Sequence, residues 1–363
     1  MTGLLPPLER IPREIACLAD YEPQARARLG DQAWSYLAGG AGDGLTQAAN
    51  RSAFDALRLW PRLLRGSAGA TTRISLLGLD LAHPVIVAPL AYQRLFHPEG
   101  EAAIAMAASA VEALMVASTL SSVPLEAIAA QAEGVPQWFQ LYLQPDRGLT
   151  LDLVRRAEAA GFAGLVLTVD APINGLRNHE QRAGFALPPG VVAANLAGRA
   201  PPPRGEGHPV FDVAMAHAPL WSDVAWLLGQ TSLPLILKGI LHPEDAREAV
   251  AQGAKAIIVS NHGGRTLDTL PPSIAALPRC AEAVAGEIPL LLDGGVRRGT
   301  DVLKALALGA RAVLVGRPIA QALAAAGPLG VAHGLKLLVE ELCVAMALTG
   351  IRDLREIPRD LVY

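Results

Sequence analysis

The sequence has few cysteines and little charge, and both shortages limit what the protein can be. Its three cysteines, Cys17, Cys280 and Cys343, lie far apart in 363 residues and form no CxxC pair. Such a set is typical of a reducing compartment and offers no metal-binding motif. Charged residues make up only 18% of the chain, the formal net charge is −3, and lysines and arginines are scattered. The lack of a basic patch argues against nucleic acid as a partner.

Long apolar segments are also missing. We find no stretch of about 18 uncharged apolar residues that could span a bilayer. The N-terminus, "MTGLLPPLERIPREI", lacks the cationic start and apolar run of a signal peptide. We therefore expect a cytoplasmic protein without a metal site or a membrane partner. Hydrophobic residues nevertheless make up 51% of the chain, which is enough for a large core.

Short runs rich in Val, Ile and Leu recur along the chain. They are apolar throughout, which is typical of strands buried on both faces of a parallel sheet. Most neighbouring runs are separated by one Ala-rich segment with helical spacing, such as "PEDAREAVAQG". The eight runs are 85–89, 114–118, 137–142, 164–170, 234–239, 256–261, 289–293 and 312–316.

Eight strand–helix units predict an α/β fold, a (β/α)8 TIM barrel in a single domain spanning 1–363. A doubly wound open sheet is the alternative, but it often has a glycine-rich turn after its first strand, and "APLAYQRLF" has none. We expect residues 1–80 to form a helical extension beside or under the barrel. The interval after strand 4 is the longest and rich in Pro and Gly, so residues 186–222 are expected to form a long, lid-like loop.

Polar residues follow several of these strands. Because the carboxyl ends of barrel strands converge on one pocket, these residues are candidate site residues. Lys238 is the hardest to explain structurally, since a lysine after the apolar "LPLIL" is costly in a core unless it is paired or functional. A lone Tyr142 or Gln140 could instead fill the barrel interior, and "DGG" after strand 7 could be only a tight turn. The loops "DGGVRRGTD" and "VGRP" carry glycines and arginines where barrels often bind phosphate, so a phosphorylated ligand or cofactor is expected.

Six motifs spread over nearly the whole chain resemble one family. They are "HPEGE", "WFQLY", "LTVDAP", "LKGI", "SNHGGRTLD" and "DGGVRRGTDVLKALALGARAVLVGRP". They are similar to motifs of the FMN-dependent 2-hydroxy acid oxidases and dehydrogenases, and "APLAYQRLFHPEGE" and "STLSSVPLEAIA" look closest to the 4-hydroxymandelate oxidase branch. The resemblance implies oxidation of an (S)-2-hydroxy acid to the 2-oxo acid, with FMN as cofactor and O2 reduced to hydrogen peroxide.

The resemblance also implies catalytic roles. His262 would take a proton from the substrate, and Asp170 would orient His262 and stabilise its charged form. Tyr142 would hydrogen-bond the substrate oxygen, and Lys238 would stabilise negative charge on the reduced flavin. The implied FMN-binding residues are Ala88, Pro89, Ala91, Ser118, Gln140, Thr168, Lys238, Ser260, Asp293, Gly295, Arg297, Gly316 and Arg317.

The substrate carboxylate would be held by Arg265 and Arg177, with Tyr21 nearby, since a guanidinium can bind a carboxylate through two hydrogen bonds. Many family members have Trp in place of Leu120, and several have an aromatic residue in place of Gln144. Both positions would line the substrate side. The smaller side chains here favour an aromatic, mandelate-like or otherwise bulky 2-hydroxy acid.

Other functions stay open from the sequence alone. A dehydrogenase would pass the electrons to a quinone or another diffusible acceptor instead of O2. A Schiff-base lyase would use Lys238 as its nucleophile, and a non-catalytic barrel would only bind FMN or a phospholigand. By analogy with the family we expect a homo-oligomer, a tetramer or an octamer.

Overall fold

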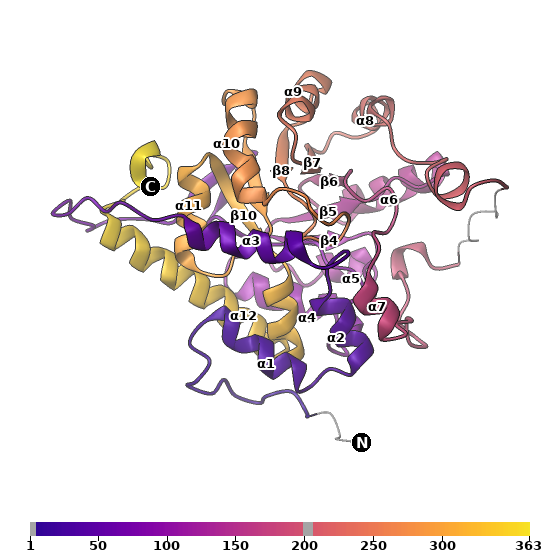
Figure 1. Ribbon diagram of the computed structural model, residues 1–363, viewed down its shortest axis with the longest axis horizontal. Helices are drawn as coiled ribbons and strands as arrows, with labels where there is room; N and C mark the ends of the chain where they lie inside the picture. The colour runs from indigo at the N-terminus through magenta and orange to yellow at the C-terminus, as the bar shows by residue number, and fades with distance from the viewer. Residues whose placement is uncertain (1–4, 199–205) are drawn as a thin grey trace.

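Eight parallel strands close into a barrel at the centre of the computed structural model, which describes residues 5–198 and 206–363 (Figure 1). Strand β10 pairs with β3, with Val313 opposite Val85, and so closes the ring. Every predicted run contains one strand, so the TIM barrel is confirmed and the open sheet is excluded. The strands are β3 (Val85–Val87), β4 (Met115–Ser118), β5 (Gln137–Leu141), β6 (Leu165–Thr168), β7 (Leu235–Ile240), β8 (Ala256–Val259), β9 (Leu290–Asp293) and β10 (Ala310–Val315).

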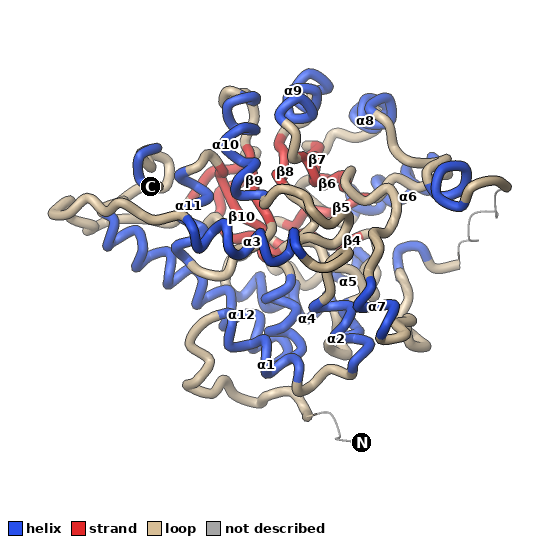
Figure 2. The backbone as a smooth tube through the Cα atoms, viewed as in Figure 1, coloured by secondary structure: helices blue, strands red, loops and turns tan. Residues whose placement is uncertain are grey.

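Burial on both faces explains why the strands were readable from the sequence. All residues of β4, β5, β6, β8 and β9 are buried, including the bulky Trp138 and Phe139. Figure 2 shows the strands at the centre with helices around them. In such a barrel, side chains on one face fill the interior and those on the other pack against the helices. In these five strands neither face is exposed, so polar and apolar residues do not alternate along them.

Helices surround the barrel. Helix α12 is the longest of the described helices and is interrupted near Ala326 and Gly327, where the backbone is not helical. Among the residues that the structure describes, none of the helices combines the length and hydrophobicity that crossing a membrane requires. The helices of the barrel part are α4 (Glu101–Ala110), α5 (Leu125–Ala129), α6 (Arg147–Ala159), α7 (Asn178–Arg182), α8 (Trp221–Leu228), α9 (Pro243–Gln252), α10 (Ser273–Val284), α11 (Gly299–Ala307) and α12 (Arg317–Thr349).

The N-terminal extension contains three α-helices and a hairpin that the sequence did not lead us to expect. Helix α1 (Tyr21–Arg26) packs against α12, α2 (Asp31–Ala38) against α7, and α3 (Leu45–Ala56) against α10. Strands β1 (Ile74–Leu76) and β2 (Leu79–Leu81) then form a short antiparallel hairpin. In Figure 1, α3 crosses in front of the barrel, whereas α1 and α2 lie beside α4 and α12.

The predicted lid-like loop, residues 186–222, includes residues 199–205, which lie outside the described residues. Its described parts contain a 3-10 turn, Ala194–Leu196, and a short π-helical segment, Pro209–Ala214. The Asn195 side chain anchors the first part, because its amide oxygen accepts from Leu125 N at 2.8 Å. Helix α8 begins at Trp221, where the predicted loop ends.

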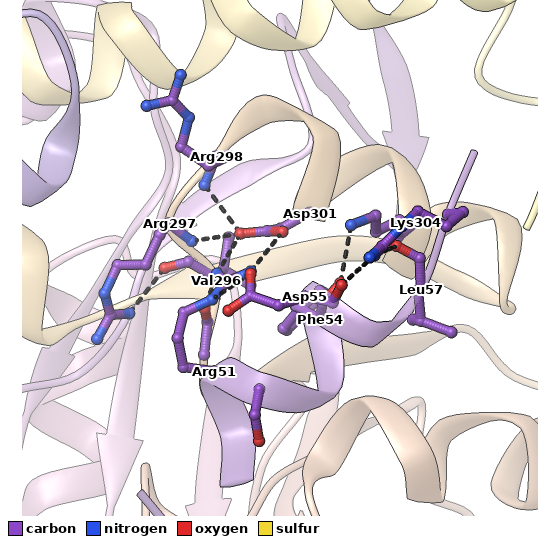
Figure 3. Close-up of polar contacts among 12 residues, drawn as sticks. Arg51, Phe54, Asp55, Leu57, Val296, Arg297, Arg298, Asp301 and Lys304 are labelled. Carbon is purple, nitrogen blue, oxygen red and sulfur yellow. Dashed lines mark hydrogen bonds and ion pairs between the residues drawn. The ribbon is translucent and has the colours of Figure 1, made fainter. Parts of the chain in front are cut away.

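A buried ion pair fastens α3 to the loop after β9 (Figure 3). Arg51 Nη1 and Nη2 donate to the carboxylate of Asp301 at 2.5 and 3.1 Å, and Nη1 also donates to Gly295 O at 2.8 Å. The Asp301 side chain is 1% exposed, and it also accepts from the backbone N–H groups of Arg297 and Arg298. One carboxylate therefore fixes both the extension and the start of α11.

We expect Arg51→Ala to destabilise the protein by about 3 kcal/mol, because it leaves the buried Asp301 carboxylate without its cation. The free energy of unfolding in urea checks this. Asp55→Ala is the matched control: Asp55 also pairs with Arg51, but its side chain is 65% exposed, so removing it should cost less than about 1 kcal/mol. Equal losses of unfolding free energy in the two variants would contradict the view that the Arg51–Asp301 pair is the main link between α3 and the loop after β9.

Candidate active site

A cavity of about 980 Å³ lies at the carboxyl-terminal ends of the barrel strands. Barrels of this fold keep their active sites at this end. The extension supplies part of its wall through Tyr36, Gln47 and Asn50, and both described parts of the 186–222 loop reach it, through residues such as Leu196 and His217. The cavity is thus built by the strand ends, the extension and the long loop together.

Most of the predicted site residues line this cavity. Three do not: Asp170 and Ser260 lie directly behind residues that do, and Tyr21 lies elsewhere. The predicted residues in the lining are Ala88, Pro89, Ala91, Ser118, Leu120, Gln140, Tyr142, Thr168, Arg177, Lys238, His262, Arg265, Asp293, Gly295, Arg297, Gly316 and Arg317.

His262 and Asp170 form a hydrogen-bonded pair at the cavity wall. Asp170 Oδ1 lies 2.8 Å from His262 Nδ1, and the backbone N–H of His262 donates to Ser260 Oγ at 3.0 Å. Burial opposes the ionisation of Asp170, but the charges of His262 and Lys238 outweigh it, so the pKa of Asp170 is lowered. An ionised Asp170 keeps the proton on Nδ1, which leaves Nε2 of His262 free to accept a proton.

Lys238 is buried, with 5% of its side chain exposed. Its Nζ lies 3.2 Å from Asp293 Oδ2 and donates to Ser260 Oγ at 3.1 Å. Burial alone would lower its pKa, but Asp293 and Asp170 raise it above the usual value for lysine. A lysine held in the ammonium form is a poor nucleophile, so this environment argues against the Schiff-base lyase. It suits the stabilisation of negative charge on a ligand.

Arg177 and Arg265 point their guanidinium groups at one carboxylate, that of Glu180. Each donates to Glu180 Oε1 at 3.2 Å. Arg265 Nη1 also donates to the carbonyl groups of Tyr36 and Gly39, and its guanidinium lies 5.0 Å from the centre of the Tyr36 ring. The structure therefore brings the two arginines together, and Arg177 Nε is buried and donates no hydrogen bond to the described residues.

The prediction for Tyr21 was wrong. Tyr21 is fully buried between α1 and α12, where its hydroxyl lies 2.9 Å from His333 Nδ1, and it does not line the cavity. Tyr36 at the end of α2 lies beside Arg265 instead and stacks on Phe185. No local sequence pattern marks Tyr36 for this position, which depends on the binding of Arg265 to the carbonyl groups of Tyr36 and Gly39.

Tyr142 also faces this part of the cavity. Burial raises the pKa of Tyr142 to about 12, although the charge of Lys238 works against the rise. The hydroxyl is therefore protonated at neutral pH and can donate a hydrogen bond to an oxygen of a ligand.

Two close approaches explain Gly264 in the loop after β8 and Gly295 in the loop after β9. A Cβ on Gly264 would lie 2.7 Å from Gln47 N, and one on Gly295 would lie 2.3 Å from Asn50 O. Both glycines have positive φ angles, 75° and 89°. The Asn50 and Asn261 amides also donate to each other at 2.8 Å. Helix α3 thus packs so closely on both loops that neither position has room for a side chain.

Two further arginines, Arg297 and Arg317, also line the cavity, and Arg317 shares the Gly39 carbonyl with Arg265. Burial, followed by the nearby charges of Arg265 and Arg297, lowers the pKa of Arg317 to about 9. Burial also lowers the pKa of Arg297. Since guanidinium groups stay charged in proteins, these shifts mean that their positive charge is poorly compensated by the described residues. A phosphate group would compensate it.

Two further polar atoms fit a flavin. Gln140 Nε2 and Asp293 Oδ1 are buried at the cavity and make no hydrogen bond with the described residues. An isoalloxazine ring presents oxygen and nitrogen acceptors to the amide donor, and a ribityl chain presents hydroxyl donors to the carboxylate. Together with the two arginines, these atoms match the polar groups of FMN.

Comparison with known proteins agrees with this chemistry. The model of the FMN-dependent dehydrogenase family matches residues 25–363. The chain is 53% identical to L-lactate oxidase of Alicycliphilus denitrificans, over 98% of each chain. It is 51% identical to 4-hydroxymandelate oxidase of Amycolatopsis orientalis, over 92% of this chain and 94% of that protein.

Solved structures show the same relationship. The structure of mandelate oxidase with benzoyl-formic acid is 48% identical, with a TM-score of 0.87, and the match covers 95% of this chain and 97% of that one. The family predicted from the six motifs and the FMN cofactor are thereby confirmed. The chain belongs to the FMN-dependent dehydrogenase family.

Proposed function

We propose that the protein oxidises an (S)-2-hydroxy acid to the 2-oxo acid and reduces O2 to hydrogen peroxide. The main support is that His262, held by Asp170, and the Arg177–Arg265 pair line the same cavity. A base and a carboxylate-binding group are the two functions that removal of a proton from a 2-hydroxy acid requires. The oxidase relatives support O2 as the electron acceptor.

Each side chain of the site has a separate role in this proposal. Arg177 and Arg265 bind and orient the substrate carboxylate, and Tyr142 donates a hydrogen bond to a substrate oxygen. His262 Nε2 takes the proton, and the ionised Asp170 stabilises the imidazolium that results. Bound FMN would supply the redox chemistry, as the acceptor of two electrons and the second hydrogen of the substrate, and O2 would reoxidise it.

The FMN contacts follow from the lining of the cavity. Arg297 and Arg317 would hold the phosphate, and Asp293 would bind the ribityl chain. The ammonium of Lys238 would stabilise negative charge on the ring. The other predicted contacts with the ring are Ala88, Pro89, Ala91, Ser118, Gln140 and Thr168, with Gly295 and Gly316 at the phosphate.

For the substrate we propose an aromatic or bulky 2-hydroxy acid, such as mandelate. Leu120 and Gln144 both line the cavity, and Gln144 is turned back onto the carbonyl of Tyr142 at 2.8 Å. Tyr92 and Phe185 extend the same wall with apolar rings. As proposals that rest on the sequence we keep the homo-oligomer, tetramer or octamer, and the cytoplasmic location.

Anaerobic mixing with (S)-mandelate or (S)-lactate should bleach the flavin absorbance, and admitting O2 should restore it. The amplitude and rate of both steps are measured by stopped-flow absorbance. No bleaching with any 2-hydroxy acid would contradict the proposed reaction. Bleaching followed by a return too slow to support turnover, but fast with a quinone, would make the protein a dehydrogenase.

Asp170→Asn should lower the rate of flavin reduction by about 10²–10⁴-fold, because the amide cannot hold His262 in the required tautomer. Flavin content and the KM of the substrate should change little. Asp212→Asn is the control, since Asp212 also lines the cavity but contacts His208 and not His262. An equal loss in both variants would point to a general electrostatic effect instead of orientation of the base.

A further inference from the structure

Glu180 is a carboxylate inside the site that the proposed reaction does not use. It lies on α7 next to the two arginines, and 14% of its side chain is exposed. A single oxygen, Oε1, accepts from Arg177 Nη1 and from Arg265 Nη2, both at 3.2 Å. Glu180 therefore occupies part of the hydrogen-bonding capacity that a substrate carboxylate would use.

The charges of this group do not cancel. Two guanidinium groups and one carboxylate leave one positive charge. Burial lowers the pKa of Arg265, the charge of Arg177 lowers it further, and Glu180 acts in the opposite direction. Glu180 thus reduces the repulsion between the arginines, and a substrate with one carboxylate brings the group to neutrality. A second carboxylate would place an uncompensated negative charge in a poorly hydrated site, where charges interact strongly.

We propose that Glu180 makes the site selective for 2-hydroxy acids with a single negative charge. The inference rests on the proposed function, because it assumes that Arg177 and Arg265 bind the substrate carboxylate. Glu180 excludes dicarboxylates through its charge, not its size, since its carboxylate is paired with the arginines. The apolar rings of Tyr36 and Phe185 beside these arginines offer no cation to a second carboxylate.

The test uses two ligands of nearly the same shape, (S)-malate and its C4 amide, which differ by one negative charge. Their inhibition constants, or KM values where they react, are measured with FMN-loaded enzyme against a monocarboxylate that bleaches the flavin. The wild-type enzyme should bind the amide at least about tenfold more tightly than malate. Equal affinities would overturn the proposal without any variant.

Glu180→Gln keeps the shape of the side chain and removes its charge. It should shift the ratio of malate to amide affinity toward malate by at least about tenfold. Glu180→Asp keeps the charge and should keep the wild-type ratio, even if its overall activity falls. Asp212→Asn removes another carboxylate of the cavity lining, one that accepts from His208 N, and its ratio should also stay unchanged.

The outcomes distinguish failure of the proposed reaction from failure of the role proposed for Glu180. If no 2-hydroxy acid reduces the wild-type flavin, the proposed function itself fails. If the flavin is reduced but Glu180→Gln leaves the ratio unchanged, or Asp212→Asn shifts it equally, Glu180 is only a structural support for the arginines. If Glu180→Gln does not retain FMN, the wild-type enzyme and Glu180→Asp are compared instead. Both keep the negative charge, so both should bind the amide more tightly than malate. Equal affinities for the two ligands in either enzyme would contradict the charge effect.

Discussion

The buried charge of Lys238 determines much of the chemistry at the mouth of the barrel. An ammonium group this deep is tolerable only if carboxylates compensate it, and Asp293 and Asp170 do so. The same Asp170 binds His262, so a residue that helps to keep Lys238 charged also holds the imidazole proposed as the base. Ser260 contacts both Lys238 Nζ and the backbone of His262. The flavin side and the substrate side of the site are therefore one network of charges.

The N-terminal extension is as much a part of the site as the barrel. Helix α3 lies so close to Gly264, in the loop after β8, and to Gly295, in the loop after β9, that neither position has room for a side chain. Helix α2 ends at the carbonyl groups that hold Arg265, and the Leu37 carbonyl accepts from Arg317 Nε. A barrel without the extension would lack the partners that position these arginines.

The sequence predicted the barrel well for a physical reason. Strands buried on both faces are apolar along most of their length, so they can be recognised as apolar runs without knowledge of how the surrounding helices pack. The chemistry at their ends was also readable, because a strand end fixes where His262, Lys238 and Asp293 can lie. The residues Tyr21 and Tyr36 show the limit. Both belong to helices whose position depends on docking against α12 and the loops, and no local pattern tells which of them enters the cavity.

Glu180 shows a second limit of the sequence. It follows Arg177 by three residues on a short helix, and such pairs are common on surfaces, where they contribute little. The fold brings Arg265, from the loop after β8, to the same oxygen. The Glu180 carboxylate therefore joins two arginines of the cavity instead of forming an ordinary pair on a helix surface.

The positive charge of the cavity is therefore distributed unevenly. Near the substrate, Glu180 compensates one of two arginines. Arg297 and Arg317 form no ion pair with a carboxylate among the described residues, and the charge of Arg265 adds to the lowering of the pKa of Arg317. Arg297 and Arg317 are therefore suited to a ligand group with more than one negative charge, such as the phosphate of FMN. Arg177 and Arg265, with Glu180, are suited to a group with one, such as a substrate carboxylate.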